Sequence, residues 1–237
     1  MDSFLKIAHR GYSSRYPENT MLAFEKAVTA GADMIELDVR LSRDGRLVVI
    51  HDERIDRTAD GTGVVADLTL DELKRHSYSC RMAEFGFVEI PALEEVIEWA
   101  GERVMLNIEI KNRPHRNEGI EGKLAGLLRE TRFTDRAVVS SFDHYALAEM
   151  KRIDGAIRRG ILYSAVWLHF VEEVREINPF SVHPGANAFD VDQLRWAKSR
   201  GIRVYPWVVQ NRETLRAYRA SGCVDGAMVT DLDLFDA

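Results

Sequence analysis

The sequence predicts a single eight-stranded β/α (TIM) barrel, and three observations support this fold class. The chain has 237 residues, which is close to the usual size of such a barrel and short for two large domains. Short strand-like segments alternate along the sequence with amphipathic segments that have the period of a helix. Two of the strand-like segments carry acidic side chains on one face only, as expected if barrel strands direct these side chains toward a common centre.

The first elements can be justified in order along the chain. Residues 5–8 form a short apolar strand, and 20–30 form an amphipathic helix that ends at Gly31, a residue suited to a helix terminus. The alternating strand 33–41 follows, and the Asp44-Gly45 turn leads it into 47–50 as a hairpin.

The rest of the chain continues the alternation of strands and helices. Further strands are predicted at 104–110, 137–140, 160–163, 180–183, 202–208 and 226–229. Amphipathic helices are predicted at 93–100, 120–130, 145–152, 191–200 and 212–221.

Residues 52–90 do not follow this rhythm. They contain Gly61-Thr62-Gly63 and a capping box, Thr69 with Glu72, that predicts the start of a short helix. We interpret this segment as a local insertion after the hairpin, at the catalytic end of the barrel, because loops at that end carry function. The whole chain, 1–237, is then one barrel domain.

Composition excludes several classes of protein. The formal net charge is −6 and no basic run is present, so a nucleic-acid partner is not expected. No apolar stretch approaches the length of a membrane span, and the first strand begins too early to follow a signal peptide. Cys80 and Cys223 lack metal-binding spacing. The sequence therefore predicts a cytoplasmic protein with reduced thiols.

Three carboxylates indicate a metal site. Glu36 and Asp38 share one face of the strand 33–41, and Glu109 shares a face with Asn107 and Lys111 in the alternating run 106–111. Residues two apart on a strand lie about 6.5 to 7 Å apart, so both side chains can reach one cation. Either strand alone would also fit an edge strand that turns its polar face to water. Carboxylates that converge in a barrel mouth would repel one another without a cation, and oxygen ligands favour one Mg²⁺ or Ca²⁺.

Two histidines accompany the carboxylates. His9 follows the first strand, and His51 follows the hairpin and precedes Asp52. An imidazole pKa near 6.5 suits proton transfer at neutral pH. The alternative is that His9 and His51 are ligands of a Zn²⁺ or Mn²⁺ centre. Asp52 either orients His51 or caps the following loop.

Taken together, these motifs resemble the glycerophosphodiester phosphodiesterase family. The matching segments are His9-Arg10-Gly11, Pro17-Glu18-Asn19-Thr20, Glu36-Leu37-Asp38, His51-Asp52 and Glu109-Ile110-Lys111. The resemblance implies metal-dependent hydrolysis of glycerophosphodiesters, which are deacylated phospholipids, to an alcohol and glycerol 3-phosphate. It also implies that His9 and His51 are the general acid and base, and that a glycerol hydroxyl of the substrate attacks phosphorus to give a cyclic phosphate.

Substrate contacts can be assigned less directly. Arg10 and Lys111 would neutralise the phosphate oxygens. Phe142 and Trp207, at predicted strand ends, either form an aromatic wall for a head group such as choline or belong to the core. His183 either lines the pocket or packs inside the protein. Asn19 and Thr20 are interpreted as a helix cap.

The last third of the chain departs from the family pattern. Trp207-Val208-Val209-Gln210 stands where the family often has Trp-Thr-Val-Asn, and Thr230-Asp231-Leu232-Asp233 stands where it has Thr-Asp-x-Pro. These departures bear on substrate preference more than on chemistry.

Other functions remain as alternatives. They are a phosphodiesterase acting on lysophospholipids or other diesters, and a non-catalytic barrel that binds phosphorylated ligands. An isomerase or aldolase with Lys111 as a Schiff-base nucleophile is disfavoured, because Glu109 shares its face of the strand.

Overall fold

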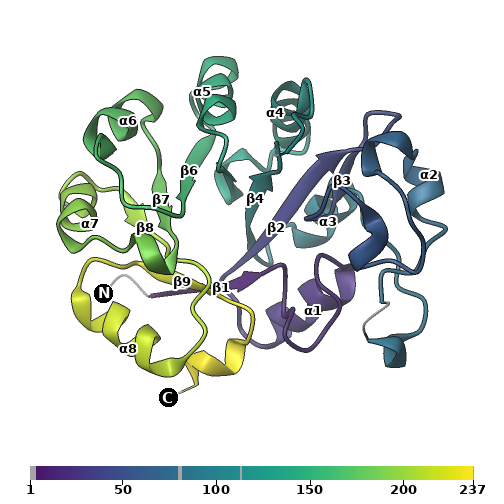
Figure 1. Ribbon diagram of the computed structural model, residues 1–237, viewed down its shortest axis with the longest axis horizontal. Coiled ribbons are helices and arrows are strands. Elements are labelled where there is room, and N and C mark those ends of the chain that lie inside the picture. The colour runs from purple at the N-terminus through teal and green to yellow at the C-terminus, as the bar shows by residue number, and fades with distance from the viewer. Residues whose placement is uncertain (1–3, 80–81, 113, 237) are drawn as a thin grey trace.

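The computed structural model describes residues 4–79, 82–112 and 114–236, so Cys80 lies outside the described residues. Eight parallel strands form the barrel wall in the order β8-β7-β6-β5-β4-β2-β1-β9 (Figure 1). The predicted fold class is therefore confirmed. The strands are β1 (Leu5–His9), β2 (Met34–Leu41), β4 (Met105–Ile110), β5 (Ala137–Ser141), β6 (Arg158–Tyr163), β7 (Ser181–Pro184), β8 (Arg203–Val204) and β9 (Gly226–Val229).

Helices surround the strands (Figure 1). They are α1 (Met21–Thr29), α3 (Leu93–Ala100), α4 (Ile120–Glu130), α5 (His144–Ile153), α6 (Phe170–Ile177), α7 (Val191–Lys198) and α8 (Arg212–Ser221). Helix α6 is absent from the elements predicted above, although Phe170, Val174 and Ile177 have helical spacing and are buried. The missed helix restores the strand-helix alternation between β6 and β7.

The strand predicted at 202–208 is wrong in length, because β8 comprises only Arg203–Val204. Proline has no backbone N–H, so Pro206 cannot continue the ladder. The segment still closes the barrel through backbone hydrogen bonds. Asp225 N–H donates to Val204 O at 3.0 Å, and Met228 N–H donates to Pro206 O at 3.0 Å.

The alternation of β2 divides its side chains between two apolar environments, and every residue of the strand is buried. Ile35, Leu37 and Val39 belong to the large core that also contains the apolar faces of the helices. Met34, on the other face, belongs to a smaller cluster with Ile7, Val138, Tyr205 and Met228. The face that carries Met34 also carries Glu36 and Asp38, which places both acids on the inside of the barrel.

The predicted hairpin and the short helix of the insertion are both present. β3 (Leu47–Val49) pairs antiparallel with β2. Helix α2 (Leu70–Leu73) begins with the predicted capping box, in which the Thr69 hydroxyl accepts from Glu72 N–H and the Glu72 carboxylate accepts from Thr69 N–H. The insertion has a small core of its own against β3, made of Val48, Ile50, Ile55, Ala59, Val65, Leu70, Leu73, Tyr78, Ile90 and Ala92.

Candidate functional site

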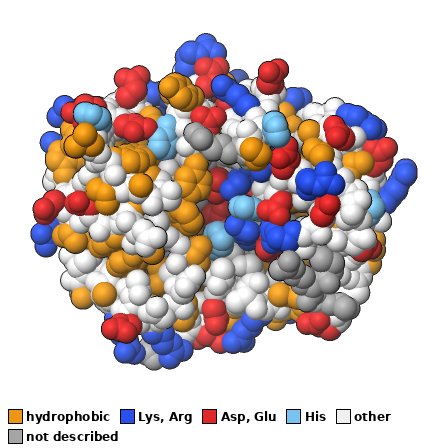
Figure 2. Space-filling view, in the orientation of Figure 1, with side chains coloured by type: hydrophobic (Ala, Val, Ile, Leu, Met, Phe, Trp, Pro, Cys, Tyr) orange, Lys and Arg blue, Asp and Glu red, His pale blue; other side chains and the backbone are white. Residues whose placement is uncertain are grey.

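A cavity lies at the carboxyl ends of the barrel strands. Its lining includes His9, Arg10, Glu36, His51, Asn107, Glu109, Lys111, Phe142, Leu162, Trp207 and Met228. A second cavity of about 350 Å³ shares four of these residues and extends toward Asp52 and Asp143. Figure 2 shows histidine, acidic and basic side chains gathered around a hollow near the middle of this face, with hydrophobic side chains beside it. The structure thus brings the sequence-predicted residues to one place.

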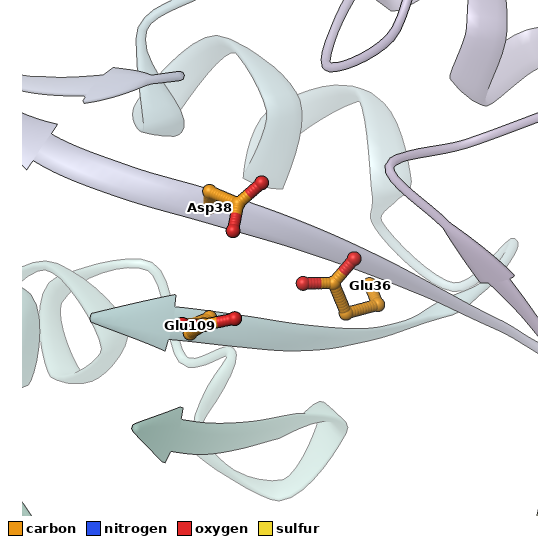
Figure 3. Close-up of side chains that lie close together, drawn as sticks. All are labelled: Glu36, Asp38 and Glu109. Carbon is orange, nitrogen blue, oxygen red and sulfur yellow. The ribbon is translucent and has the colours of Figure 1, made fainter. Parts of the chain in front are cut away.

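The three carboxylates come together through the register of β2 and β4. Asp38 is directly opposite Glu109 in this parallel pair, and Glu36 is opposite Asn107. One oxygen from each of Glu36, Asp38 and Glu109 lies within 4.8 Å of the others, and all three residues are buried (Figure 3). Three hard oxygen donors converging in this way could hold one divalent cation.

Burial and mutual repulsion disturb the ionisation of these acids. Burial, followed by the charges of Asp38 and Glu109, raises the pKa of Glu36 well above its usual range. Burial also raises the pKa of Glu109 to about 7, although Lys111 opposes the shift. Burial acts in the same direction on Asp38, but Arg10 and Lys111 outweigh it and lower the pKa of Asp38. Without further positive charge, the cluster therefore favours protons on its two glutamates.

Two positively charged side chains lie directly beside the acids. Arg10 Nε is 3.3 Å from Asp38 Oδ2. Lys111 Nζ is 2.8 Å from Glu109 Oε1 and 3.6 Å from Asp38 Oδ1. The ion pairs of Lys111 with these two acids raise its pKa against the effect of burial. Lys111 therefore stays charged, and the Schiff-base role is disfavoured by its surroundings as well as by its strand.

His9 ends β1 and faces the acids. Its Nε2 is 3.9 Å from Glu36 Oε2. Its Nδ1 is shielded from solvent and has no hydrogen-bond partner among the described residues. Burial, and then the charge of Arg10, lowers the pKa of His9 to about 3. The imidazole is therefore neutral at physiological pH in this arrangement, so one ring nitrogen can donate a hydrogen bond and the other can accept one.

His51 belongs to a network of charged side chains, which we call the His51–Arg10 network. His51 Nδ1 lies 2.5 Å from Asp52 Oδ1, and Arg57 Nε donates to Asp52 Oδ2 at 2.5 Å. Arg57 also donates to both oxygens of Glu18, at 2.8 and 2.7 Å. Glu18 in turn accepts from Arg10 Nη1 at 2.9 Å. Asp52 therefore orients the His51 ring through its Nδ1 atom.

The His51–Arg10 network leads to a prediction for Arg57. We expect Arg57→Gln to lower kcat by about 10- to 100-fold, the usual range for a lost outer contact that orients a functional side chain. KM should change much less, because Arg57 supports His51 through Asp52. Steady-state kinetics compare this variant with Arg54→Gln, a control in the same segment whose exposed side chain pairs with Asp56. Equal rates for the two variants would contradict the prediction.

The Pro17–Thr20 motif has two roles. Thr20 is the N-cap of α1 and accepts from Ala23 N–H, as expected. Asn19 does not cap the helix, which corrects the interpretation of this residue. Its Nδ2 donates to Asp38 Oδ2 at 2.8 Å, and its Oδ1 accepts from Asp38 N–H at 3.4 Å. Asn19 therefore positions a carboxylate, a function that depends on the fold and could not be read from the motif.

The two aromatic residues meet at the edge of the cavity. The rings of Phe142 and Trp207 are 5.2 Å apart in an edge contact. Lys111 Nζ lies 6.0 Å from the centre of the Phe142 ring. His183 is fully buried and contacts Ser181 Oγ through Nε2 at 2.7 Å, so it packs inside the barrel and does not line this cavity.

Asn107 is a further residue of the site, with no role predicted from the sequence. This residue is completely buried and lines the cavity. Neither its amide nitrogen nor its amide oxygen has a hydrogen-bond partner among the described residues. A buried amide without partners is costly, so Asn107 is suited to contact a ligand or water. Its place two residues before Glu109 was the signal that could have found it.

Comparison with known proteins shows to which family the chain belongs. The model of the glycerophosphoryl diester phosphodiesterase family matches residues 9–234. The chain belongs to this family. It is 39% identical over 229 residues to a glycerophosphodiester phosphodiesterase of Caldanaerobacter subterraneus subsp. tengcongensis, covering 96% of this chain and 94% of that protein.

Solved structures of the family share the fold. An Oleispira antarctica phosphodiesterase in complex with the product sn-glycerol-3-phosphate has a TM-score of 0.87 at 28% identity, covering 98% of this chain and 97% of that one. The glycerophosphodiester phosphodiesterase of Thermotoga maritima has a TM-score of 0.80 at 31% identity, covering 100% and 98%. No helix in the described part of this family member is both long and apolar enough to cross a membrane.

Proposed function

We propose that this chain hydrolyses glycerophosphodiesters to an alcohol and glycerol 3-phosphate. The observation that carries the proposal is the single cavity in which two histidines, a lysine and an arginine surround the acid cluster. The O. antarctica relative, bound to sn-glycerol-3-phosphate, supports glycerol phosphate as the product. The family membership supports the phosphodiester as the substrate. The cytoplasmic location inferred from the sequence stays a prediction.

We assign one Mg²⁺ or Ca²⁺ to Glu36, Asp38 and Glu109. The fit rests on three buried oxygen donors within 4.8 Å of one another and on Asp38 Oδ1, which has no hydrogen-bond partner among the described residues. Burial, together with the charges of neighbouring acids, raises the pKa values of the two glutamates, and a bound cation would favour their ionised forms. A bound cation would act as a Lewis acid on a phosphoryl oxygen.

The protein's own cations act on the phosphate. Arg10 and Lys111 line the cavity and are held there by their ion pairs with the acids. A phosphodiester carries negative charge that increases on its non-bridging oxygens in the transition state. Guanidinium and ammonium groups already in place stabilise that charge without reorganisation. Phe142 and Trp207 would contact the head group at the edge of the cavity.

The two histidines divide the proton transfers. One removes the proton of the attacking hydroxyl, and the other protonates the departing alcohol, whose alkoxide is a poor leaving group. His9 lies next to Glu36, whereas His51 is oriented by Asp52. Both line the same cavity, so both can reach one substrate.

The nucleophile is tested with an altered substrate. If the neighbouring glycerol hydroxyl attacks phosphorus, its proximity is equivalent to an effective molarity that can reach about 10⁵ M or more. We therefore expect glycerophosphodiesters to exceed bis(p-nitrophenyl) phosphate in kcat/KM, despite the better leaving group of the latter. A 2-deoxy glycerol analogue should bind as a competitive inhibitor and be nearly inert.

Product release measured by ³¹P NMR separates the possible outcomes. Comparable turnover of the deoxy analogue would show that water attacks directly, and the cyclic phosphate would be abandoned. Failure of every glycerophosphodiester to react, with the cation supplied, would refute the proposed function itself.

A further inference from the structure

A separate cavity of about 230 Å³ lies at the opposite end of the barrel from the acid cluster. We call it the amino-end cavity, because its strand residues are all the first residues of their strands or come directly after. They are Leu5, Met34, Met105, Ala137, Val138, Arg158 and Arg203. Side chains at this end of a β/α barrel usually serve stability, so a lined cavity here calls for an explanation of its own.

Three arginines line the amino-end cavity: Arg136, Arg158 and Arg203. Arg136 Nη2 donates to the backbone oxygen of Glu102 at 2.9 Å, and Arg158 Nη1 donates to that of Asp135 at 2.7 Å. Neither Arg136 nor Arg158 has a carboxylate partner among the described residues. The Nε of Arg136 is also shielded from solvent and has no hydrogen-bond partner there.

The acid in the amino-end cavity is already neutralised. Asp225 pairs with Lys198 and lies 3.0 Å from Arg203 Nη1. Its other oxygen accepts from Val204 N–H at 2.9 Å. The charges of Arg136 and Arg158 therefore remain uncompensated beside a partly apolar cavity. Guanidinium groups are well matched to a phosphate dianion, because each presents parallel N–H donors to its oxygens.

The remaining wall of the amino-end cavity is apolar. Phe180 and Tyr205 supply rings, and Leu5, Met34 and Met105 supply aliphatic surface. The Arg158 guanidinium lies 5.0 Å from the centre of the Phe180 ring, so charge and apolar surface adjoin. The volume of about 230 Å³ falls below the range of about 300 to 1,000 Å³ usual for drug-sized ligands. The wall therefore suits a small molecule with an anionic end and an apolar end.

We propose that the amino-end cavity is a second binding site, for a small organic phosphate monoester. The phosphate contacts Arg136 and Arg158, and the organic part lies against Phe180 and Met105. This site takes no part in the proposed hydrolysis, since the acid cluster is at the other end of the strands.

Phenyl phosphate is a suitable probe, because it combines a phosphate dianion with a ring. Methionine methyl groups labelled with ¹³C report the two sites by NMR: Met34 and Met105 line the amino-end cavity, whereas Met228 lines the cavity of the acid cluster. We expect phenyl phosphate to shift the Met34 and Met105 resonances saturably. These shifts should persist in a Lys111→Ala variant, which alters only the catalytic cavity.

Variants then test the arginines. Losing two charge-assisted contacts should weaken binding at Met34 and Met105 by about tenfold or more in Arg136→Gln/Arg158→Gln. Arg75→Gln, which removes an exposed charge in the insertion, is the control and should bind like the unaltered chain. If the double variant does not fold, the single Arg158→Gln variant is measured with the same expectation of weaker binding.

Several outcomes would overturn the proposal. They are unmoved Met34 and Met105 resonances at millimolar phenyl phosphate, unchanged affinity in the arginine variants, and phenol that binds as tightly as phenyl phosphate. Equal affinity for inorganic phosphate would overturn the assignment to an organic monoester. None of these results depends on turnover, so failure of this site is distinguishable from failure of the proposed phosphodiesterase function.

Discussion

Removal of the divalent cation by exhaustive chelation is expected to abolish turnover, and Mg²⁺ or Ca²⁺ should restore it. Loss of a Lewis acid removes several kcal/mol of transition-state stabilisation. Each tenfold in rate corresponds to about 1.4 kcal/mol, so kcat/KM should fall by at least about 100-fold. Activity that is undiminished after chelation would refute the assigned site.

Substitution of the acids tests the same site by a second route. Glu36→Ala, Asp38→Ala and Glu109→Ala should each weaken cation binding, measured by isothermal titration calorimetry, as well as lower the rate. Glu25→Gln is the control, because Glu25 is exposed on α1. An acid variant that loses activity while binding the cation normally would remove that residue from the ligand set.

The histidines should behave differently from the acids. We expect His9→Ala and His51→Ala each to lower turnover by about 10² to 10⁴, the range for loss of a general acid or base. Cation binding should be nearly unchanged, because the three carboxylates are the assigned donors. His169→Ala, at an exposed residue before α6, is the matched control and should retain full activity.

The alternative for the histidines predicts the opposite result. If either residue were a ligand of a Zn²⁺ or Mn²⁺ centre, its alanine variant would lose the metal while the fold, followed by circular dichroism, stayed intact. That outcome would replace the acid/base assignment of the residue concerned.

The barrel and the acid cluster could be predicted because both follow from periodicity. Alternation along one strand places Glu36 and Asp38 on a common face, and the same rule places Glu109 on its own strand. Parallel strands of a barrel then bring these faces to a shared interior. The match between Asp38 and Glu109 depends on the strand register, which the structure supplies.

Other parts of the site could not be predicted, because they depend on long-range contacts. The link between Glu18 and Arg57 joins residues 39 positions apart, and no periodicity reports the path of the insertion that carries Arg57. Asn19 resembled a helix cap because local chemistry at a helix start is the same whether or not a carboxylate lies nearby. The end of β8 could have been predicted from Pro206, because proline cannot donate a backbone hydrogen bond to a neighbouring strand.

The separate core of the insertion links the packing of that segment to the orientation of His51. Its apolar residues pack against β3 and form a cluster distinct from the main core. Such a unit can open locally while the barrel stays folded. Arg57 belongs to this unit and contacts both Asp52 and Glu18. Looser packing around Ile55 or Leu73 would therefore disturb the orientation of His51, so the reaction can be tuned by residues that never meet the substrate.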